Sequence, residues 1–226
     1  MQILHLSPCL WPAWGCGDVA LRVWLLARAQ ARLGHEVRVL TSDCCAPHER
    51  TASGTSFEDG VHVTRLRTHH SSSRWLVGLT WPVGFRAALA AQLRDARPDV
   101  VHAHELLTWE LARAASRLPT SGQLIVSPHT ALRTALLAPG ILRLWRVAGG
   151  TRATRRVDTC LCDTPEDVGA AAALFQQLGV PPPPMVPLAL GPTGWPPMAP
   201  ADATGGAPDA WCRAAEAIVA RYARPA

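Results

Sequence analysis

The sequence predicts an α/β protein built on a doubly wound parallel sheet. An apolar strand at residues 2–6 leads through a loop of small residues into an amphipathic helix at 18–33 and a second apolar strand at 36–41. Helical and extended patterns then alternate at short spacings as far as about residue 190. This alternation is typical of βαβ units, in which each helix returns the chain to a parallel neighbour. Ligands of such folds collect at the carboxyl ends of the strands.

The first helix has recognisable ends and one apolar face. Asp18 is the expected N-cap, and Gly34 is the expected C-terminal stop. Val19, Val23 and Leu26 recur at helical spacing, so we expect this face to pack on the sheet.

The middle of the chain continues the alternation. Residues 42–60 are polar and contain Gly and Ser, which predicts a long loop. The elements expected after it are a strand at 61–66, a helix at 81–94, a short buried strand at 99–103, a helix at 105–118, a strand at 123–127 and a helix over 131–147 that is broken near Pro139 and Gly140.

The last third begins with a strand at 158–163 and a strong helix start. Thr164 is the expected N-cap, Pro165 occupies the first helical position, and Glu166 adds an acid that the helix dipole favours. Gly179 ends this helix, and a last strand is expected beyond it. The expected parts are a Rossmann-like domain at 1–190 with its last strand at 185–190, a Pro/Gly/Ala linker at 191–208 and a C-terminal helix at 209–226.

The charged residues exclude several function classes. All 22 basic residues are Arg, so lysine Schiff-base chemistry and a Walker-type phosphate loop are both excluded. The net charge of +5 is spread along the chain, and no Arg run alternates with aromatic residues as in single-strand binders. We therefore expect no nucleic-acid partner.

The cysteines indicate a reducing environment. Seven cysteines occur without framework spacing, and no C-x-x-C pattern indicates a zinc site. We expect free thiols and a cytoplasmic protein, with no secretory signal before the first strand. The longest apolar stretch, residues 75–85, is too short to span a bilayer.

Five short stretches, in order, resemble the N-terminal domain of the GT-B glycosyltransferases of family 4. The resemblance covers residues 1 to about 190 and implies one domain of the GT-B architecture. It also implies transfer of a sugar, with retention, from a nucleotide-sugar donor to a sugar or lipid-linked acceptor. The matching stretches are Ile3-Leu4-His5-Leu6-Ser7-Pro8, Gly15-Cys16-Gly17 with the helix ending Leu33-Gly34-His35-Glu36-Val37, Pro98-Asp99-Val100-Val101-His102-Ala103-His104, Ser127-Pro128-His129-Thr130, and Val157-Asp158 leading into Thr164-Pro165-Glu166.

The glycine loop is the first substrate-binding candidate. In the family this loop lies near the donor diphosphate and the acceptor, which points to Gly15, Cys16 and Gly17. Glycine permits close backbone approach, and amides at a helix N-terminus favour an anion. Cys16 stands where many relatives have glycine. The alternative interpretation is a loop that only connects strand to helix.

The histidines at the predicted strand ends supply the other candidates. His129 matches the family histidine that contacts the transferred sugar, so it is the catalytic candidate; an imidazole there can donate to a hydroxyl or stabilise developing charge. His104 and Glu105 match positions that line the interdomain cleft and are substrate-binding candidates. We expect His102 to be a core histidine. No carboxylate or cysteine has suitable spacing for a metal site, and no cofactor is expected.

The chain departs from the family where the donor would bind. The paired glutamates of the donor domain, spaced E-x7-E, are absent, since no two glutamates here are eight positions apart. We therefore expect a truncated protein that engages a nucleotide-sugar only with a second domain, and a partner chain is one source of it. The C-terminal helix is expected to pack back on the domain, as in the family.

Several alternatives stay open at this stage. The chain could be a non-catalytic module that binds a sugar or lipid acceptor, or an inactive truncated product. A dinucleotide oxidoreductase is a weaker rival, because Gly15, Gly17 and Ala20 meet its pattern but the loop before them is too long. The Arg-rich segment 133–156 is either a solvated helix face or a peripheral contact with the inner face of a membrane.

Overall fold

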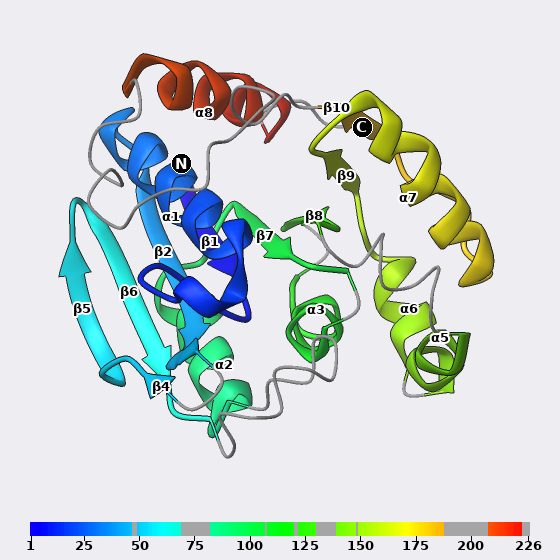
Figure 1. The fold of residues 1–226 in the computed structure, drawn as a ribbon, viewed down its shortest axis with the longest axis horizontal. Helices are drawn as coiled ribbons and strands as arrows, with labels where there is room; N and C mark the ends of the chain where they lie inside the picture. Colours follow the sequence, from blue (N-terminus) through cyan, green and yellow to red (C-terminus); the bar gives the residue numbers. More distant parts are fainter. Residues whose placement is uncertain are drawn as a thin grey trace.

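The computed structural model confirms the α/β class, and its centre is one eight-stranded sheet (Figure 1). It describes residues 1–46, 49–68, 82–106, 108–119, 122–129, 139–147, 149–187 and 208–222. The strands of the sheet are β1 (Gln2–Leu6), β2 (Glu36–Ser42), β5 (Gly54–Glu58), β6 (Val61–Leu66), β7 (Val100–His104), β8 (Gln123–Ser127), β9 (Thr159–Cys162) and β10 (Met185–Pro187).

The strand order is that of a doubly wound sheet. It runs β10-β9-β8-β7-β1-β2-β6-β5, and every neighbouring pair is parallel except β5 with β6. β1 therefore lies at the centre, with β7 on one side and β2 on the other. Residues of β1 and β7 are in register, so His5 lies beside His102.

Helices cover both faces of this sheet. They are α1 (Asp18–Arg32), α2 (Phe85–Asp95), α3 (Trp109–Ala115), α5 (Pro139–Val147), α6 (Gly150–Thr154), α7 (Pro165–Gln177) and α8 (Pro208–Tyr222), with a short 3-10 turn η1 (Trp14–Cys16) before α1. Among the described helices, none has the length and apolar character needed to cross a bilayer.

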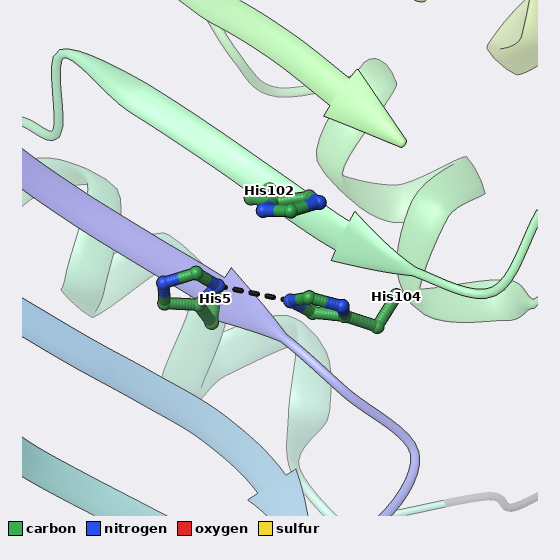
Figure 2. Close-up of side chains that lie close together, drawn as sticks. All are labelled: His5, His102 and His104. Atoms are coloured by element: carbon green, nitrogen blue, oxygen red, sulfur yellow. Dashed lines mark hydrogen bonds between the residues drawn. The ribbon is translucent and has the colours of Figure 1, made fainter. Parts of the chain in front are cut away.

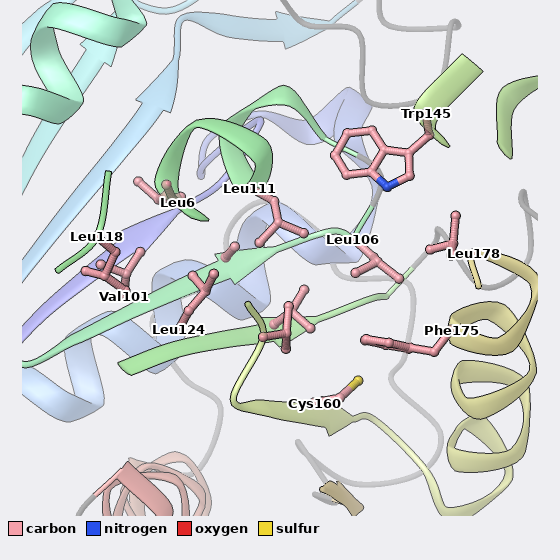
Figure 3. Packing of buried hydrophobic residues seen from close by; sticks show 14 of the residues in the cluster. Leu6, Val101, Leu106, Leu111, Leu118, Leu124, Trp145, Cys160, Phe175 and Leu178 are labelled. Atoms are coloured by element: carbon pink, nitrogen blue, oxygen red, sulfur yellow. The ribbon is translucent and has the colours of Figure 1, made fainter. Parts of the chain in front are cut away.

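The alternation of side chains along the strands separates two apolar layers. On one face, Ile3 of β1 packs with Leu26 of α1 and with the C-terminal helix α8. On the other, Leu111, Trp145 and Phe175 converge on the sheet from α3, α5 and α7 (Figure 3). This second layer is the larger of the two, and its residues are almost fully buried.

The C-terminal helix packs as expected. α8 lies beside α1 on the same face of the sheet (Figure 1). The residues that it buries there are Trp211, Ala215, Ile218 and Tyr222, and Val219 packs partly buried against them. Residues 188–207, which include almost all of the expected linker and the end of the expected last strand, lie outside the described part of the chain.

The expectation of a long loop at residues 42–60 is wrong. That segment contains β5 and a small antiparallel pair formed by β3 (Cys44–Ala46) and β4 (Glu49–Arg50). β5 and β6 form a hairpin, whose turn residues Asp59 and Gly60 both have positive φ, at 48° and 86°. An Asp-Gly pair is a strong hairpin signal. The expectation of a loop followed the polar composition of β5 instead of this signal.

Helix boundaries also differ from the expectation. Gly17, with φ 72°, occupies the N-cap of α1, and Asp18 is its first helical residue. The helix expected at 105–118 forms only as the seven-residue α3, and the one at 81–94 is α2. A separate helix, α6, begins after Gly149, whose backbone is in the left-handed conformation. Of the broken helix at 131–147, only α5 lies in the described residues.

The start of α7 follows its sequence signal closely. The Thr164 hydroxyl accepts a hydrogen bond from the Asp167 amide at 3.2 Å, and the Asp167 carboxylate accepts one from the Thr164 amide at 3.1 Å. This reciprocal capping box, with Pro165 in the first turn, satisfies amides that would otherwise lack partners. Because α7 follows β9 directly, the cap also fixes the chain at the carboxyl end of that strand.

Candidate functional site

Three neighbouring strands bring their carboxyl ends together at the candidate site. His104 is the last residue of β7, His129 follows the end of β8, and Asp163 follows the end of β9. Nδ1 of His104 lies 3.1 Å from Nε2 of His129, and Nδ1 of His129 lies 3.0 Å from Oδ2 of Asp163. The structure thus joins two of the sequence candidates in one row and adds Asp163 to them.

The backbone at this edge is strained at two residues. Glu105 has φ 88° and His129 has φ 28°, which are backbone conformations that residues other than glycine rarely adopt. The Glu105 amide donates to the Ser127 carbonyl at 2.8 Å, which holds the turn after β7 against the end of β8. Strain of this kind persists only where the surroundings hold it, and it concentrates at functional sites.

Asp163 and His129 form a largely buried ion pair. The His129 side chain is only 2% exposed, and the Arg22 guanidinium of α1 lies 3.2 Å from the same Asp163 oxygen. Burial by itself lowers the pKa of His129, but the hydrogen bond and charge of Asp163, aided by Glu105, outweigh burial and raise it. Burial would raise the pKa of Asp163, yet His129 and Arg22 hold it below its usual value. Both directions favour imidazolium beside carboxylate.

Two further histidines extend the row into the protein (Figure 2). Nδ1 of His5 lies 2.9 Å from Nε2 of His104, and Nε2 of His5 lies 2.7 Å from the Gln30 amide oxygen. His102 bonds through Nε2 to the Ser127 hydroxyl and through Nδ1 to the Tyr222 hydroxyl, each at 2.8 Å. His102 is thus a core histidine with both nitrogens satisfied, as expected.

Burial keeps the inner histidines neutral. It lowers the pKa of His5 to about 4, although the hydrogen bond with Gln30 acts in the opposite direction. The pKa values of His102 and His104 are also well below the usual value, first because of burial and then because of the neighbouring histidines. His104 is 2% exposed, so it meets the sheet edge through His129 rather than by lining a surface.

The three-histidine cluster was not expected from the sequence. Imidazole nitrogens of His5, His102 and His104 lie within 4.8 Å of one another, and neutral imidazoles so arranged can hold a metal of the zinc class. No spacing along the chain indicates this cluster, because the third histidine comes from β1. The register of β1 with β7 is the signal that places it there. In this structure the ring nitrogens of all three have hydrogen-bond partners.

Asp163 was missed for a different reason. Asp163 is the last residue of the expected strand at 158–163 and precedes a strong helix start, so the local pattern predicts secondary structure there and no site residue. A polar residue at the carboxyl end of a strand beside the strand of His129 is the signal that would have found it.

The glycine loop lies where expected, before α1. Gly15 belongs to η1, and Gly17 is exposed. A Cβ at Gly17 would meet nothing within 4 Å, so glycine is favoured there by its positive φ of 72° and not by lack of space. The position of the Cys16 side chain is outside the described part. The structure therefore leaves an accessible loop at the helix N-terminus, as an anion site requires.

The described part of the Arg-rich segment exposes arginines of α5, as both interpretations of that segment require. Leu142 and Trp145 of α5 point into the core, while Arg143 and Arg146 remain exposed. These two arginines line a hollow of about 700 Å³ between α5, α6 and α7. Arg156 instead binds Asp158 and the Gly122 carbonyl. Residues 133–138 and 148 of the segment lie outside the described residues.

Two solved structures are similar to this chain, and the first of them supports the fold. Sucrose-phosphate synthase from Thermosynechococcus elongatus is similar at 13% identity, with a TM-score of 0.54 over 83% of this chain and 48% of that one. The catalytic domain of starch synthase IV from Arabidopsis thaliana, bound to ADP and acarbose, is 14% identical, with a TM-score of 0.48 over 83% and 51%. This chain spans about half the length of these proteins.

The sequence comparisons identify the family. A search of curated proteins finds no match. The family model described as Glycosyl transferase 4-like domain matches residues 17–191, which contain α1, the strands from β2 onward and the row from His104 to Asp163. Since this match covers well over half of the chain, and the fold agrees with it, the chain belongs to the family of Glycosyl transferase 4-like domains.

Proposed function

We propose that this chain is the acceptor-binding half of a retaining glycosyltransferase that uses a nucleotide-sugar donor. The observation that supports it best is the row from His104 through His129 to Asp163 at the carboxyl ends of adjacent strands. Ligands of doubly wound sheets bind at this edge. The strained backbone at Glu105 and His129 marks the same edge.

In this proposal His129 acts by its charge. Both of its ring nitrogens are engaged, one with His104 and the other with Asp163, so neither is free in this state to donate to a sugar hydroxyl. An imidazolium fixed beneath the strand ends stabilises the negative charge that develops on a departing diphosphate. Low local dielectric strengthens that effect, because water does not screen the buried charge.

The donor requires groups from a second domain, whether in the same polypeptide or in a partner chain. A diphosphate carries several negative charges, and transfer depends on their positioning and pairing. The paired glutamates of the family's donor domain are absent from this sequence. Gly15, Cys16 and Gly17 would face the donor and acceptor from this half, and Glu105, which follows β7, would line the same cleft.

A non-catalytic acceptor-binding module is the second candidate. The observation that favours it is the burial of His129, whose side chain is 2% exposed. A module of this kind would bind a sugar or lipid-linked acceptor and show no dependence of binding on the charge of His129. Six free thiols among the described cysteines suit a cytoplasmic location for either candidate.

The experiment measures sugar transfer and donor hydrolysis from UDP- and GDP-sugars, first with this chain alone and then with a family donor domain added. We expect no turnover by the chain alone and transfer once the donor domain is present. In the combined enzyme, His129→Asn should reduce kcat by about 10²–10³-fold, the usual cost of losing one stabilising group. Turnover by the chain alone would refute the need for a second domain.

The matched control is His62→Gln on β6, which lies outside the histidine row. Its kcat should equal that of the unchanged protein. If the two variants behave alike in an enzyme that transfers sugar, His129 has no role in the reaction. If added donor domain yields no transfer but acceptor sugars bind, the second candidate is correct.

A further inference from the structure

The buried polar side chains form one continuous chain of hydrogen bonds. It starts at an acid on the sheet edge, crosses the centre of the sheet, passes through α1 and α8 and returns to β8. In order, its members are Asp163, His129, His104, His5, Gln30, Tyr222, His102 and Ser127. Each link joins two atoms that together must supply one hydrogen, so the chain has a direction.

The two groups that flank the first three histidines fix that direction. A carboxylate only accepts, so Nδ1 of His129 donates to Asp163. The Gln30 amide oxygen also only accepts, so Nε2 of His5 donates to it. In the row of three imidazoles formed by His129, His104 and His5, the outer nitrogen at each end therefore carries a hydrogen.

A row with acceptors at both ends needs one additional proton. His5 donates from Nε2, so if it is neutral its Nδ1 accepts from Nε2 of His104. A neutral His104 then accepts at Nδ1 from Nε2 of His129. His129 consequently donates from both nitrogens, which only the imidazolium form can do.

We propose that the Gln30 amide and the Asp163 carboxylate together fix His129 as an imidazolium, with His5, His102 and His104 as neutral tautomers protonated on Nε2. Gln30 and Asp163 are thus positioning residues that act on the site through the order of hydrogen bonds. The use of this charge rests on the proposed function, but its existence does not. Three histidines in contact with one another take different states because their terminal partners differ.

The branch beyond Gln30 agrees with the same order. The Gln30 amide nitrogen donates to the Tyr222 hydroxyl oxygen at 3.5 Å, and that hydroxyl donates to Nδ1 of His102. Nε2 of His102 then donates to the Ser127 hydroxyl. Every link from Asp163 to Ser127 is satisfied, and no other proton is needed.

The charges around His129 allow this state. Asp163 and Glu105 favour its charged form, while burial and Arg22 oppose it, and His104 is the uncharged contact on β7. The Arg22 guanidinium lies 3.2 Å from the Asp163 oxygen that His129 also contacts. The direction of the His129 pKa, which is raised, agrees with the order of hydrogen bonds but is independent of it.

The opposite orientation of one amide would reverse the result. If the Gln30 nitrogen faced His5, the hydrogen bonds from Gln30 through His5 and His104 to His129 would all reverse, while Nδ1 of His129 would still donate to Asp163. All four histidines would then be neutral and protonated on Nδ1. The position of the ring protons therefore tests the proposal directly.

The experiment is a long-range 1H–15N correlation spectrum of the full chain, labelled with 15N-histidine, at pH 7. We expect one ring with protons on both nitrogens, assigned to His129 through His129→Gln. The rings of His5, His102 and His104 should carry a proton on Nε2 only. Four neutral rings protonated on Nδ1 would overturn the proposal. No donor or acceptor is present, so the result is independent of whether the chain takes part in sugar transfer.

Variants of the two charged neighbours should act in opposite directions. Asp163→Asn removes the anion and should weaken proton binding at His129 by about tenfold or more, since a paired opposite charge shifts a pKa by about 1–3. Arg22→Gln removes a repelling cation on a partly exposed side chain and should leave His129 doubly protonated at pH 7. A merely structural role for this pair would not give opposite signs. Loss of the second proton in both variants, or in neither, would contradict the proposal.

A metal ion bound by His5, His102 and His104 would replace the proposed order of protons, and a separate experiment tests for it. Purified chain is analysed for zinc and then titrated with Zn²⁺ alone, with His62→Gln as the control. We expect no stoichiometric zinc, because Nδ1 of His5 and Nε2 of His104 are already in contact at 2.9 Å. One zinc per chain, retained in the control and lost in His5→Gln, would overturn the proton-ordered network.

Discussion

At the scale of single residues, neighbouring histidines differ because their partners differ. His104 and His129 are 3.1 Å apart, yet the pKa of one is well lowered and that of the other is raised. Burial lowers the pKa of both, but only His129 contacts the Asp163 carboxylate. One acid at the end of β9 therefore decides where positive charge can reside in this site.

The Tyr222 hydroxyl offers a residue-scale prediction. Tyr222→Phe keeps the ring but leaves Nδ1 of His102 buried without its donor, which should lower the free energy of unfolding by about 1–3 kcal/mol. Urea unfolding followed by circular dichroism measures the change. Ser116→Ala is the control, because its hydrogen bond to the Arg113 carbonyl is exposed and water can replace it. Equal midpoints for the two variants would mean that the buried bond does not form.

At the scale of elements, the short helix α6 depends on a close approach of backbone to ring. Gly150 is buried at the start of α6, and a Cβ there would overlap atoms of the Trp145 indole of α5. Trp145 is itself part of the larger apolar layer (Figure 3). The packing of α6 against Trp145 of α5 therefore requires that residue 150 has no side chain.

Two glycine substitutions test this element. Gly150→Ala should lower the free energy of unfolding by about 1–3 kcal/mol through overpacking against Trp145. Gly169→Ala in α7 has open space around its Cβ and an exposed position, and it should raise that free energy by about 0.5–1 kcal/mol through helix propensity. Thermal melts compare the two variants. A stabilised Gly150→Ala would show that Trp145 does not pack there.

What the sequence could and could not predict follows from the range of each interaction. The capping box at Thr164 depends on local sequence and formed as expected, whereas the packing of α8, expected from the family resemblance, joins helices far apart in the chain. The candidate His129 was found from a strand-end motif, but Asp163 and His5 meet it only through the pairing of distant strands. No spacing along the chain encodes such register.

At the scale of the whole molecule, the histidine network makes stability depend on pH. The pKa values of His5, His102 and His104 are lowered on folding, so their contribution is complete above the ordinary value of 6.5 and is lost as pH falls below it. The pKa of His129 is raised, so its contribution is complete below 6.5 and is lost as pH rises through its folded value. Three groups therefore act on the acid side and one on the alkaline side.

We expect the free energy of unfolding to fall more steeply from pH 6.5 to 4.5 than from pH 6.5 to 8.5. Each histidine that takes up a proton on unfolding adds up to about 1.4 kcal/mol per pH unit to the slope. Chemical denaturation at fixed temperature across this range measures it. His5→Gln should reduce the acid slope, and His62→Gln should not. A profile that is flat between pH 7 and 5 would contradict neutral buried histidines.

The bond between Gln30 and Tyr222 joins positions 192 residues apart, and His102 meets Tyr222 across 120. During synthesis the strands β1, β7 and β8 leave the ribosome long before α8, and contacts so distant in sequence form late. Until α8 docks, the inner end of the row faces water, which can donate or accept at Gln30 and His102. The charge state of the sheet edge is therefore settled only when translation has passed residue 222, so a nascent chain still lacking its last helix carries an unordered site.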